Sequence, residues 1–128
     1  MKIDGACHCG AIRFEARISP KLVTLCHCSD CQTISGAPYR VNVRVLREAF
    51  QLFGEPKRYV KRGSSGEPVV TTFCGACGSA IHSFKEGGDT LNLRLGVITQ
   101  RAELTPSLQG FCDSALPWAF DITGVERA

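Results

Sequence analysis

Residues 12–18 read IRFEARI, and their side chains alternate strictly between apolar and charged. Successive side chains of a β-strand point to opposite faces of a sheet, so this alternation predicts a strand with one buried face. Residues 39–45, YRVNVRV, repeat the pattern. Shorter segments bounded by Gly, Pro and Ser predict strands at 22–25, 48–53, 58–62, 69–73, 80–84 and 91–95. Apart from one helical turn after Cys28, where Ser29 and Gln32 fit a capping box, we expect an all-β fold.

The composition is that of an ordinary globular protein. The chain has 128 residues, which suits one domain over residues 1–128, with 44% hydrophobic and 21% charged residues. No apolar run approaches the roughly 18 residues of a membrane span, and the first residues lack the apolar region of a signal peptide. We therefore expect a cytoplasmic protein with no membrane partner.

The net charge of +3 is spread along the chain. The densest basic stretch, 57–62, alternates like the solvated face of a strand, so nucleic acid is not the expected partner.

Eight cysteines are heavy usage for a chain of this length. In a secreted protein they would form disulfides, whereas in a reducing compartment they would more often hold metal. The lack of an export signal favours metal. Seven of the eight fall in three motifs, CHCG at 7–10, CHCSDC at 26–31 and CGACG at 74–78.

The spacing within these motifs has a physical meaning. Residues i and i+2 of a strand project to one face, so each Cys-His-Cys motif can present both sulfurs to one ion. The intervening His8 and His27 would then point to the opposite face, which makes them poor ligand candidates. The Cys-x-x-Cys pair at 74–77 needs a tight turn instead, and Gly75 and Gly78 allow it.

Seven thiolates match the sum of one closed and one open zinc site. A structural zinc takes four protein ligands, and a catalytic zinc takes three and keeps one open position. The two pairs followed by glycine make the natural closed site, formed by Cys7, Cys9, Cys74 and Cys77. The open site would then be formed by Cys26, Cys28 and Cys31. An alternative remains, in which a fourth ligand such as His82 closes the second site as well.

The cysteine motifs and the segments around them resemble the glutathione-dependent formaldehyde-activating (GFA) enzyme family, which includes centromere protein V. The matching segments are GACHCG at 5–10, CHCSDC at 26–31, SGA at 35–37, FCGACGS at 73–79, LGVI at 95–98 and LPW at 116–118. Together they cover essentially the whole chain. The family often has a histidine near residues 109–111, where this chain has QGF.

The resemblance implies the β-tent fold of the B-type methionine sulfoxide reductases, with small antiparallel sheets joined by zinc. It implies two Zn²⁺ per chain. The structural zinc is bound by Cys7, Cys9, Cys74 and Cys77, and the catalytic zinc is bound by Cys26, Cys28 and Cys31, where occupancy is left open. The implied activity is that of a carbon–sulfur lyase, in which glutathione adds to formaldehyde to give S-hydroxymethylglutathione. The expected partners are a small thiol such as glutathione and a small aldehyde. Whether the chain forms a homodimer is left open.

The charge of the open site favours thiol chemistry. Three thiolates leave a zinc dication with one net negative charge, so a soft thiol is a better fourth ligand than water. We expect the substrate sulfur to bind there with a lowered pKa, next to the aldehyde. Arg40, Arg44 and Arg94 are candidates to hold substrate carboxylates, although each also suits a solvent-facing strand position.

Three further residues leave alternatives open. His82 suits a general base, a ligand, or a hydrogen-bonded structural residue. Cys112 lies in a segment faintly similar to the nucleophile region of methionine sulfoxide reductases, but a half-buried free thiol is the simpler interpretation. Trp118 fits a core anchor better than a substrate-stacking residue. A non-enzymatic zinc module that binds protein or nucleic acid is the remaining alternative function.

Overall fold

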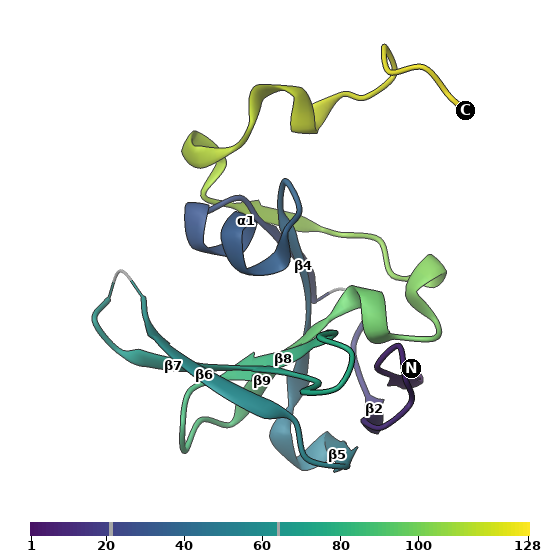
Figure 1. Cartoon of the computed structure of the whole chain (residues 1–128), viewed down its shortest axis with the longest axis vertical. Coiled ribbons are helices and arrows are strands. Elements are labelled where there is room, and N and C mark those ends of the chain that lie inside the picture. Colours follow the sequence, from purple (N-terminus) through teal and green to yellow (C-terminus); the bar gives the residue numbers. More distant parts are fainter. Residues whose placement is uncertain (21, 64) are drawn as a thin grey trace.

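Two β-sheets packed on a common core make up the fold (Figure 1). The computed structural model describes residues 1–20, 22–63 and 65–128. In this part of the chain the smaller sheet has the strand order β1-β2-β5 and the larger β10-β3-β4-β9-β8-β7-β6. The strands are β1 (Lys2–Ala6), β2 (Arg13–Arg17), β3 (Val23–Cys26), β4 (Arg40–Leu46), β5 (Phe50–Phe53), β6 (Lys57–Arg62), β7 (Pro68–Phe73), β8 (Ala80–Phe84), β9 (Thr90–Arg94) and β10 (Leu108–Gly110). Neighbouring strands pair antiparallel, except β10 and β3, which pair parallel.

One short α-helix, α1 (Ser29–Ser35), connects β3 to β4. It ends at Gly36, whose φ of +66° is the left-handed conformation that glycine adopts without strain. The other helical segments are short 3₁₀ turns: Arg47–Ala49, Leu95–Val97, Arg101–Glu103, Cys112–Ser114 and Pro117–Phe120. The prediction of a mainly β fold with a helical turn after Cys28 is therefore confirmed.

Strand pairing divides the larger sheet into an apolar face and a polar face. Directly opposed residues of antiparallel strands point to the same side. Val43, Leu93 and His82 are opposed across β4, β9 and β8, on the side that faces the smaller sheet. Asn42 and Arg94 are opposed to each other one position along from Val43 and Leu93, so they lie on the other side of the sheet. The core between the sheets includes Ile3, Phe14, Ala16, Val23, Val45, Leu91 and Ile98.

All eight predicted strand segments are present, with ends that differ by at most two residues. Two strands, β1 and β10, were not predicted. β1 contains Gly5, and the structure shows why this position is a glycine. A Cβ there would lie 1.9 Å from the carbonyl oxygen of Val97. β10 has three residues and pairs in parallel, so no alternation of its own marks it.

Residues 111–128 form a C-terminal arm that leads away from the sheets (Figure 1). Trp118 in this arm is 56% exposed, so the prediction of a core anchor is wrong. Phe120, also largely exposed, makes a ring contact with buried His27 at 5.2 Å between centroids.

Candidate metal centres

Four cysteines from two distant turns form the first cluster. Cys7 and Cys9 lie between β1 and β2, and Cys74 and Cys77 lie between β7 and β8. All four sulfurs lie within 4.8 Å of one another, with Sγ–Sγ distances of 3.6 Å between Cys7 and Cys9 and 3.7 Å between Cys9 and Cys74. Sulfurs held about 2.3 Å from a tetrahedral zinc lie roughly 3.8 Å apart. The residues therefore fit a four-coordinate metal ion, and the cluster links the smaller sheet to the larger.

Hydrogen bonds around this cluster suit thiolates. The backbone N–H of Ile12 donates to Cys7 Sγ at 3.3 Å. The Ser79 hydroxyl accepts from the backbone N–H of His8 at 3.0 Å, so its own hydrogen can be donated to Cys77 Sγ, 3.3 Å away. Donation from the Ser79 hydroxyl, followed by its backbone N–H, lowers the pKa of Cys77 to about 5. Donors of this kind orient metal ligands and stabilise their charged form.

The prediction that each Cys-His-Cys motif lies along a strand is wrong. Residues 7–10 form a turn closed by a 3.0 Å bond from Gly10 N–H to the Cys7 carbonyl, with Gly10 at φ +81°. In the second motif only Cys26 belongs to a strand, and Cys28 lies beyond its end. Turn geometry, not strand alternation, brings the paired sulfurs together.

The second cluster consists of Cys26, Cys28 and Cys31, whose sulfurs also lie within 4.8 Å of one another. Cys26 ends β3, Cys28 is the N-cap of α1, and Cys31 lies in the first helical turn. Cys28 Sγ accepts the backbone N–H of Cys31 at 3.3 Å. The helix is therefore capped by a cysteine and not by Ser29, which corrects the predicted capping box. The Gln32 side chain instead donates to the His27 carbonyl at 2.8 Å.

Buried cations lie beside this second cluster. Arg40, 7% exposed, donates two hydrogen bonds to Cys31 Sγ, at 2.8 Å from Nη2 and 3.3 Å from Nε. Arg94, 6% exposed, donates to the side chains of Asn42 and Thr71. Burial, with the nearby charge of Arg40, lowers the pKa of Arg94 to about 9, although the thiols of this cluster oppose that effect. The positive charge beside the cluster favours thiolates, whereas burial raises the pKa of Cys26 to about 12.

A third cation approaches from the β6–β7 hairpin. Lys61 Nζ lies 3.0 Å from the carboxylate of Asp30, between the cluster residues Cys28 and Cys31, and the Lys61 side chain is only 17% exposed. No sequence signal pointed to this contact, or to the bonds between Arg40 and Cys31, because both depend on how α1 packs against the strands.

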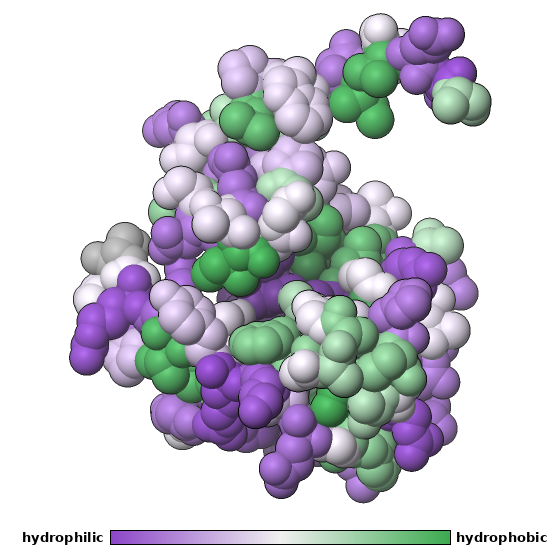
Figure 2. Space-filling view, in the orientation of Figure 1, coloured by the Kyte–Doolittle hydropathy of each residue, from purple (hydrophilic) through white to green (hydrophobic). Residues whose placement is uncertain are grey.

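A cavity of about 290 Å³ lies between the C-terminal part of α1 and the ends of β4, β8 and β9, and it is connected to the cluster through Arg40, which lines it and contacts Cys31. Arg40 and Arg94 line one side of it, and Ile34, Tyr39 and Leu95 supply apolar walls. Hydrophobic and hydrophilic residues both border the hollow below α1 in the space-filling view (Figure 2). Of the three predicted arginines, two line this cavity, whereas Arg44 is exposed elsewhere on β4.

The histidines lie outside both sulfur clusters. His27 Nε2 lies 2.9 Å from the Gln109 side-chain oxygen. His82 lies on the apolar face of the larger sheet, where its Nδ1 is 2.5 Å from Thr72 Oγ1. The alternative in which His82 closes the second metal site is therefore wrong, because Arg94 and Cys31 lie on the opposite face. A hydrogen-bonded structural role for His82 is consistent with these contacts.

Burial, followed by the charges of Arg94, Arg47 and Arg58, lowers the pKa of His82 to about 4. The unfolded chain, with a histidine pKa near 6.5, then binds a proton at a higher pH than the folded chain. The part of the folding stability that is linked to His82 is fully present above pH 6.5. It is lost as the pH falls toward 4, by on the order of 3 kcal/mol. We expect His82→Gln to remove this part of the pH dependence, measured as unfolding free energy against pH.

The exposed residue His8 supplies the control for this measurement. His8→Gln should keep the parent's pH dependence. Loss of metal in acid affects the parent and both variants alike and cancels in the comparison. Parallel curves for the parent and His82→Gln would contradict the prediction.

Cys112 belongs to neither cluster. It is exposed in the C-terminal arm, where its Sγ lies 3.9 Å from the Gln109 carbonyl oxygen. The predicted half-buried position is therefore wrong. In the described part of the chain, no helix has the length and hydropathy needed to cross a lipid bilayer.

Comparisons with known proteins show what this chain resembles. Residues 2–114 match the sequence profile of the glutathione-dependent formaldehyde-activating enzymes. A Halomonas elongata protein, provisionally named as such an enzyme, is 30% identical over 90 residues, which is 66% of this chain. The match spans 57% of that curated relative's length. A crystal structure of a Rhodobacter sphaeroides protein aligns with a TM-score of 0.63 at 16% identity, covering 83% of this chain and 98% of that one, which shows a shared fold.

Proposed function

Since this chain belongs to the glutathione-dependent formaldehyde-activating enzyme family, we propose that it is a carbon–sulfur lyase. Its reaction would join a glutathione-like thiol to formaldehyde or a related small aldehyde. The thiol sulfur adds to the carbonyl carbon, the carbonyl π electrons move to oxygen, and that oxygen takes up a proton equivalent to the one the thiol releases. The reverse reaction cleaves the same carbon–sulfur bond.

The observation that carries this proposal is the cluster of Cys26, Cys28 and Cys31, in which three sulfurs converge without a fourth protein ligand among the described residues. We assign a catalytic zinc to it. Zinc bound there would supply a Lewis-acidic position that suits a soft thiol sulfur and favours its thiolate form.

The cations around the cluster have two roles in this proposal. Three thiolates around a dication leave one net negative charge, and Arg40, with its two hydrogen bonds to Cys31 Sγ, offsets that charge. Arg94 lines the adjoining cavity and is the residue we assign to the aldehyde oxygen, which gains negative charge as the bond forms. Lys61 adds positive charge that complements the carboxylates of a glutathione-like substrate.

We assign a structural zinc to Cys7, Cys9, Cys74 and Cys77, because this cluster connects turns of the two sheets. A β-tent fold over a single domain, residues 1–128, accounts for two sheets with one core and a metal cluster between their turns. The alternative of a methionine sulfoxide reductase-like enzyme would use Cys112, an exposed thiol that belongs to neither cluster.

Cobalt substitution tests the proposed thiol site. Addition of glutathione to the cobalt-loaded protein should strengthen the sulfur-to-metal charge-transfer absorption, because the substrate adds one more thiolate to the ion. S-methylglutathione, which keeps the peptide but has no thiol, should produce no change.

Two variants control this experiment. Cys112→Ser should respond like the parent, and Cys28→Ser should not respond. Absence of a response to any thiol would refute the proposal. A response to other thiols but not to glutathione would keep the thiol chemistry and replace the substrate.

A further inference from the structure

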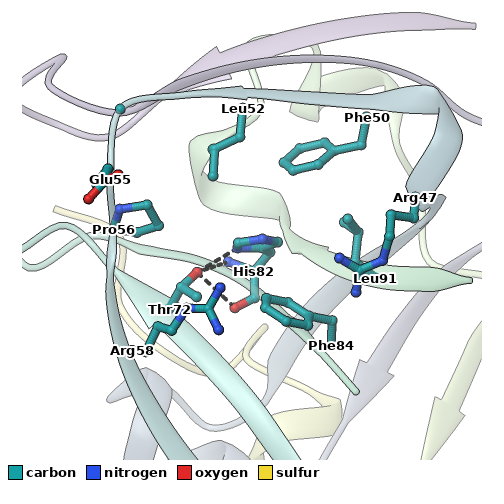
Figure 3. Close-up of a pocket in the computed structure, with 11 residues that line it drawn as sticks. Arg47, Phe50, Leu52, Glu55, Pro56, Arg58, Thr72, His82, Phe84 and Leu91 are labelled. Atoms are coloured by element: carbon teal, nitrogen blue, oxygen red, sulfur yellow. Dashed lines mark hydrogen bonds between the residues drawn. The ribbon is translucent and has the colours of Figure 1, made fainter. Parts of the chain in front are cut away.

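A second cavity, of about 450 Å³, lies on the apolar face of the larger sheet (Figure 3). Phe50 and Leu52 of β5 point from one wall toward His82 of β8, which lies opposite. Leu91 of β9 and Phe84 of β8 complete the apolar walls. The volume falls in the range of small-molecule sites, roughly 300–1,000 Å³.

The cavity is lined by the ring of His82, which Thr72 holds in place. His82 is 5% exposed, and its Nδ1 is used by Thr72, whose hydroxyl also accepts the backbone N–H of His82 at 3.2 Å. No described residue forms a hydrogen bond with the other ring nitrogen, Nε2. This nitrogen is therefore free to form a hydrogen bond with an occupant of the cavity. The Thr72 hydroxyl lies 2.5 Å from Nδ1 and 3.1 Å from the carbonyl oxygen of His82, and its donation to Nδ1 leaves Nε2–H as a donor.

Two arginines lie at the mouth of the cavity. The guanidinium carbons of Arg47 and Arg58 lie 4.8 Å and 5.5 Å from the centre of the Phe84 ring. Arg58 is paired with Glu86 at 2.7 Å. Arg47 donates to the uncharged carbonyl of Gly88 at 2.8 Å and, among the described residues, forms no ion pair.

The lining itself contains one carboxylate, Glu55, against these two guanidinium groups. Because Glu86 offsets Arg58, Arg47 is the cation that remains for an occupant, and burial, followed by the charges of Arg94, Arg47 and Arg58, opposes protonation of His82. An anionic occupant is favoured over a neutral or cationic one.

We propose that this cavity binds a small monocarboxylate with an aromatic or branched aliphatic body. The carboxylate accepts hydrogen bonds from Arg47 and from His82 Nε2, and the apolar body packs among Phe50, Leu52 and Leu91. Apolar walls with a few convergent polar groups are the usual form of such sites.

This site is separate from the thiol site and does not rest on the proposed function. His82 and Leu93 are opposed on one face of the sheet, whereas Arg94 belongs to the other face with Cys31 and Arg40. A monocarboxylate bound here therefore has the sheet between it and the three-cysteine cluster.

Titration of the zinc-loaded protein with benzoate, followed by amide NMR, tests the proposal. We expect saturable shifts at Phe50, Leu52, His82 and Phe84. Benzamide has the same ring without the charge, and it should bind about tenfold more weakly, as expected for loss of a charge-assisted hydrogen bond.

Matched variants identify the charged contact. Arg47→Gln removes an exposed side chain and should weaken benzoate binding about tenfold, while Arg44→Gln, on the same chain segment but the polar face, should leave it unchanged. Equal binding of benzoate and benzamide would overturn the proposal. Shifts confined to the three-cysteine cluster, or no saturable shifts at all, would also overturn it.

Discussion

Cys77→Ser should abolish the folded state at ordinary temperatures. Cys77 contributes one of four sulfurs in a cluster whose members come from both sheets. In small zinc modules the metal contributes on the order of 10 kcal/mol to folding, which is comparable to the entire stability of a domain, about 5–15 kcal/mol. Circular dichroism and bound-zinc analysis of the purified variant would measure the loss.

Cys28→Ser and Cys112→Ser are the matched comparisons. Cys28→Ser should remain folded, retain one zinc per chain and lose turnover, because its cluster lies within one segment, from β3 into α1. Cys112→Ser should match the parent in every respect, since that thiol is exposed and belongs to neither cluster. If Cys77→Ser and Cys28→Ser melt at the same temperature, the division into structural and catalytic sites is refuted.

Arg40→Met should accelerate release of one zinc per chain by about 10–100-fold, the usual effect of losing an outer partner of a metal ligand. The variant keeps the buried volume but removes both hydrogen bonds to Cys31 Sγ and the charge that offsets three thiolates. Release into a chromophoric chelator, followed over time, would resolve the two zinc ions. Turnover should fall together with the affinity of the faster site.

Conservative and distant substitutions separate charge from packing at this position. Arg40→Lys keeps the charge without the paired donors and should give an intermediate release rate. Arg44→Gln, four residues along β4 and exposed, should release zinc like the parent. Equal rates for Arg40→Met and the parent would show that Arg40 acts only through packing.

The sequence was informative wherever a local pattern has one structural outcome. Alternation in 12–18 and 39–45 predicted β2 and β4, and the glycine at 78 predicted the tight turn, which adopts φ +80°. The cysteine motifs predicted groups of four and three sulfurs, and the structure brings the same groups together. It does so through turns, because the spacing limits which sulfurs can meet but not which backbone conformation joins them.

Features set by strand register could not be predicted from one sequence. Alternation assigns His82 and Arg94 to strands, but only the pairing of β8 with β9 decides that they lie on opposite faces. The pairing of β3 with β4 places Arg40 opposite Cys26, and this position along the strand selects Arg40 over Arg44 as the partner of Cys31. Trp118 was misplaced for another reason: its hydrophobicity favours burial, yet the C-terminal arm offers it no core.

The two clusters also differ in when a ribosome can complete them. The ligands Cys26, Cys28 and Cys31 are all present once residue 31 has been added to the growing chain. The four-cysteine cluster stays incomplete until Cys77 has been added. At about 5–20 residues per second, several seconds separate the two events. During that interval the nascent chain exposes Cys7 and Cys9 together with the complete second cluster, enough thiolates for a wrong tetrahedral set. Metal bound early in such a wrong set must exchange ligands before the two sheets can close, whereas metal bound by Cys26, Cys28 and Cys31 need not, so the order of metallation affects the folding yield.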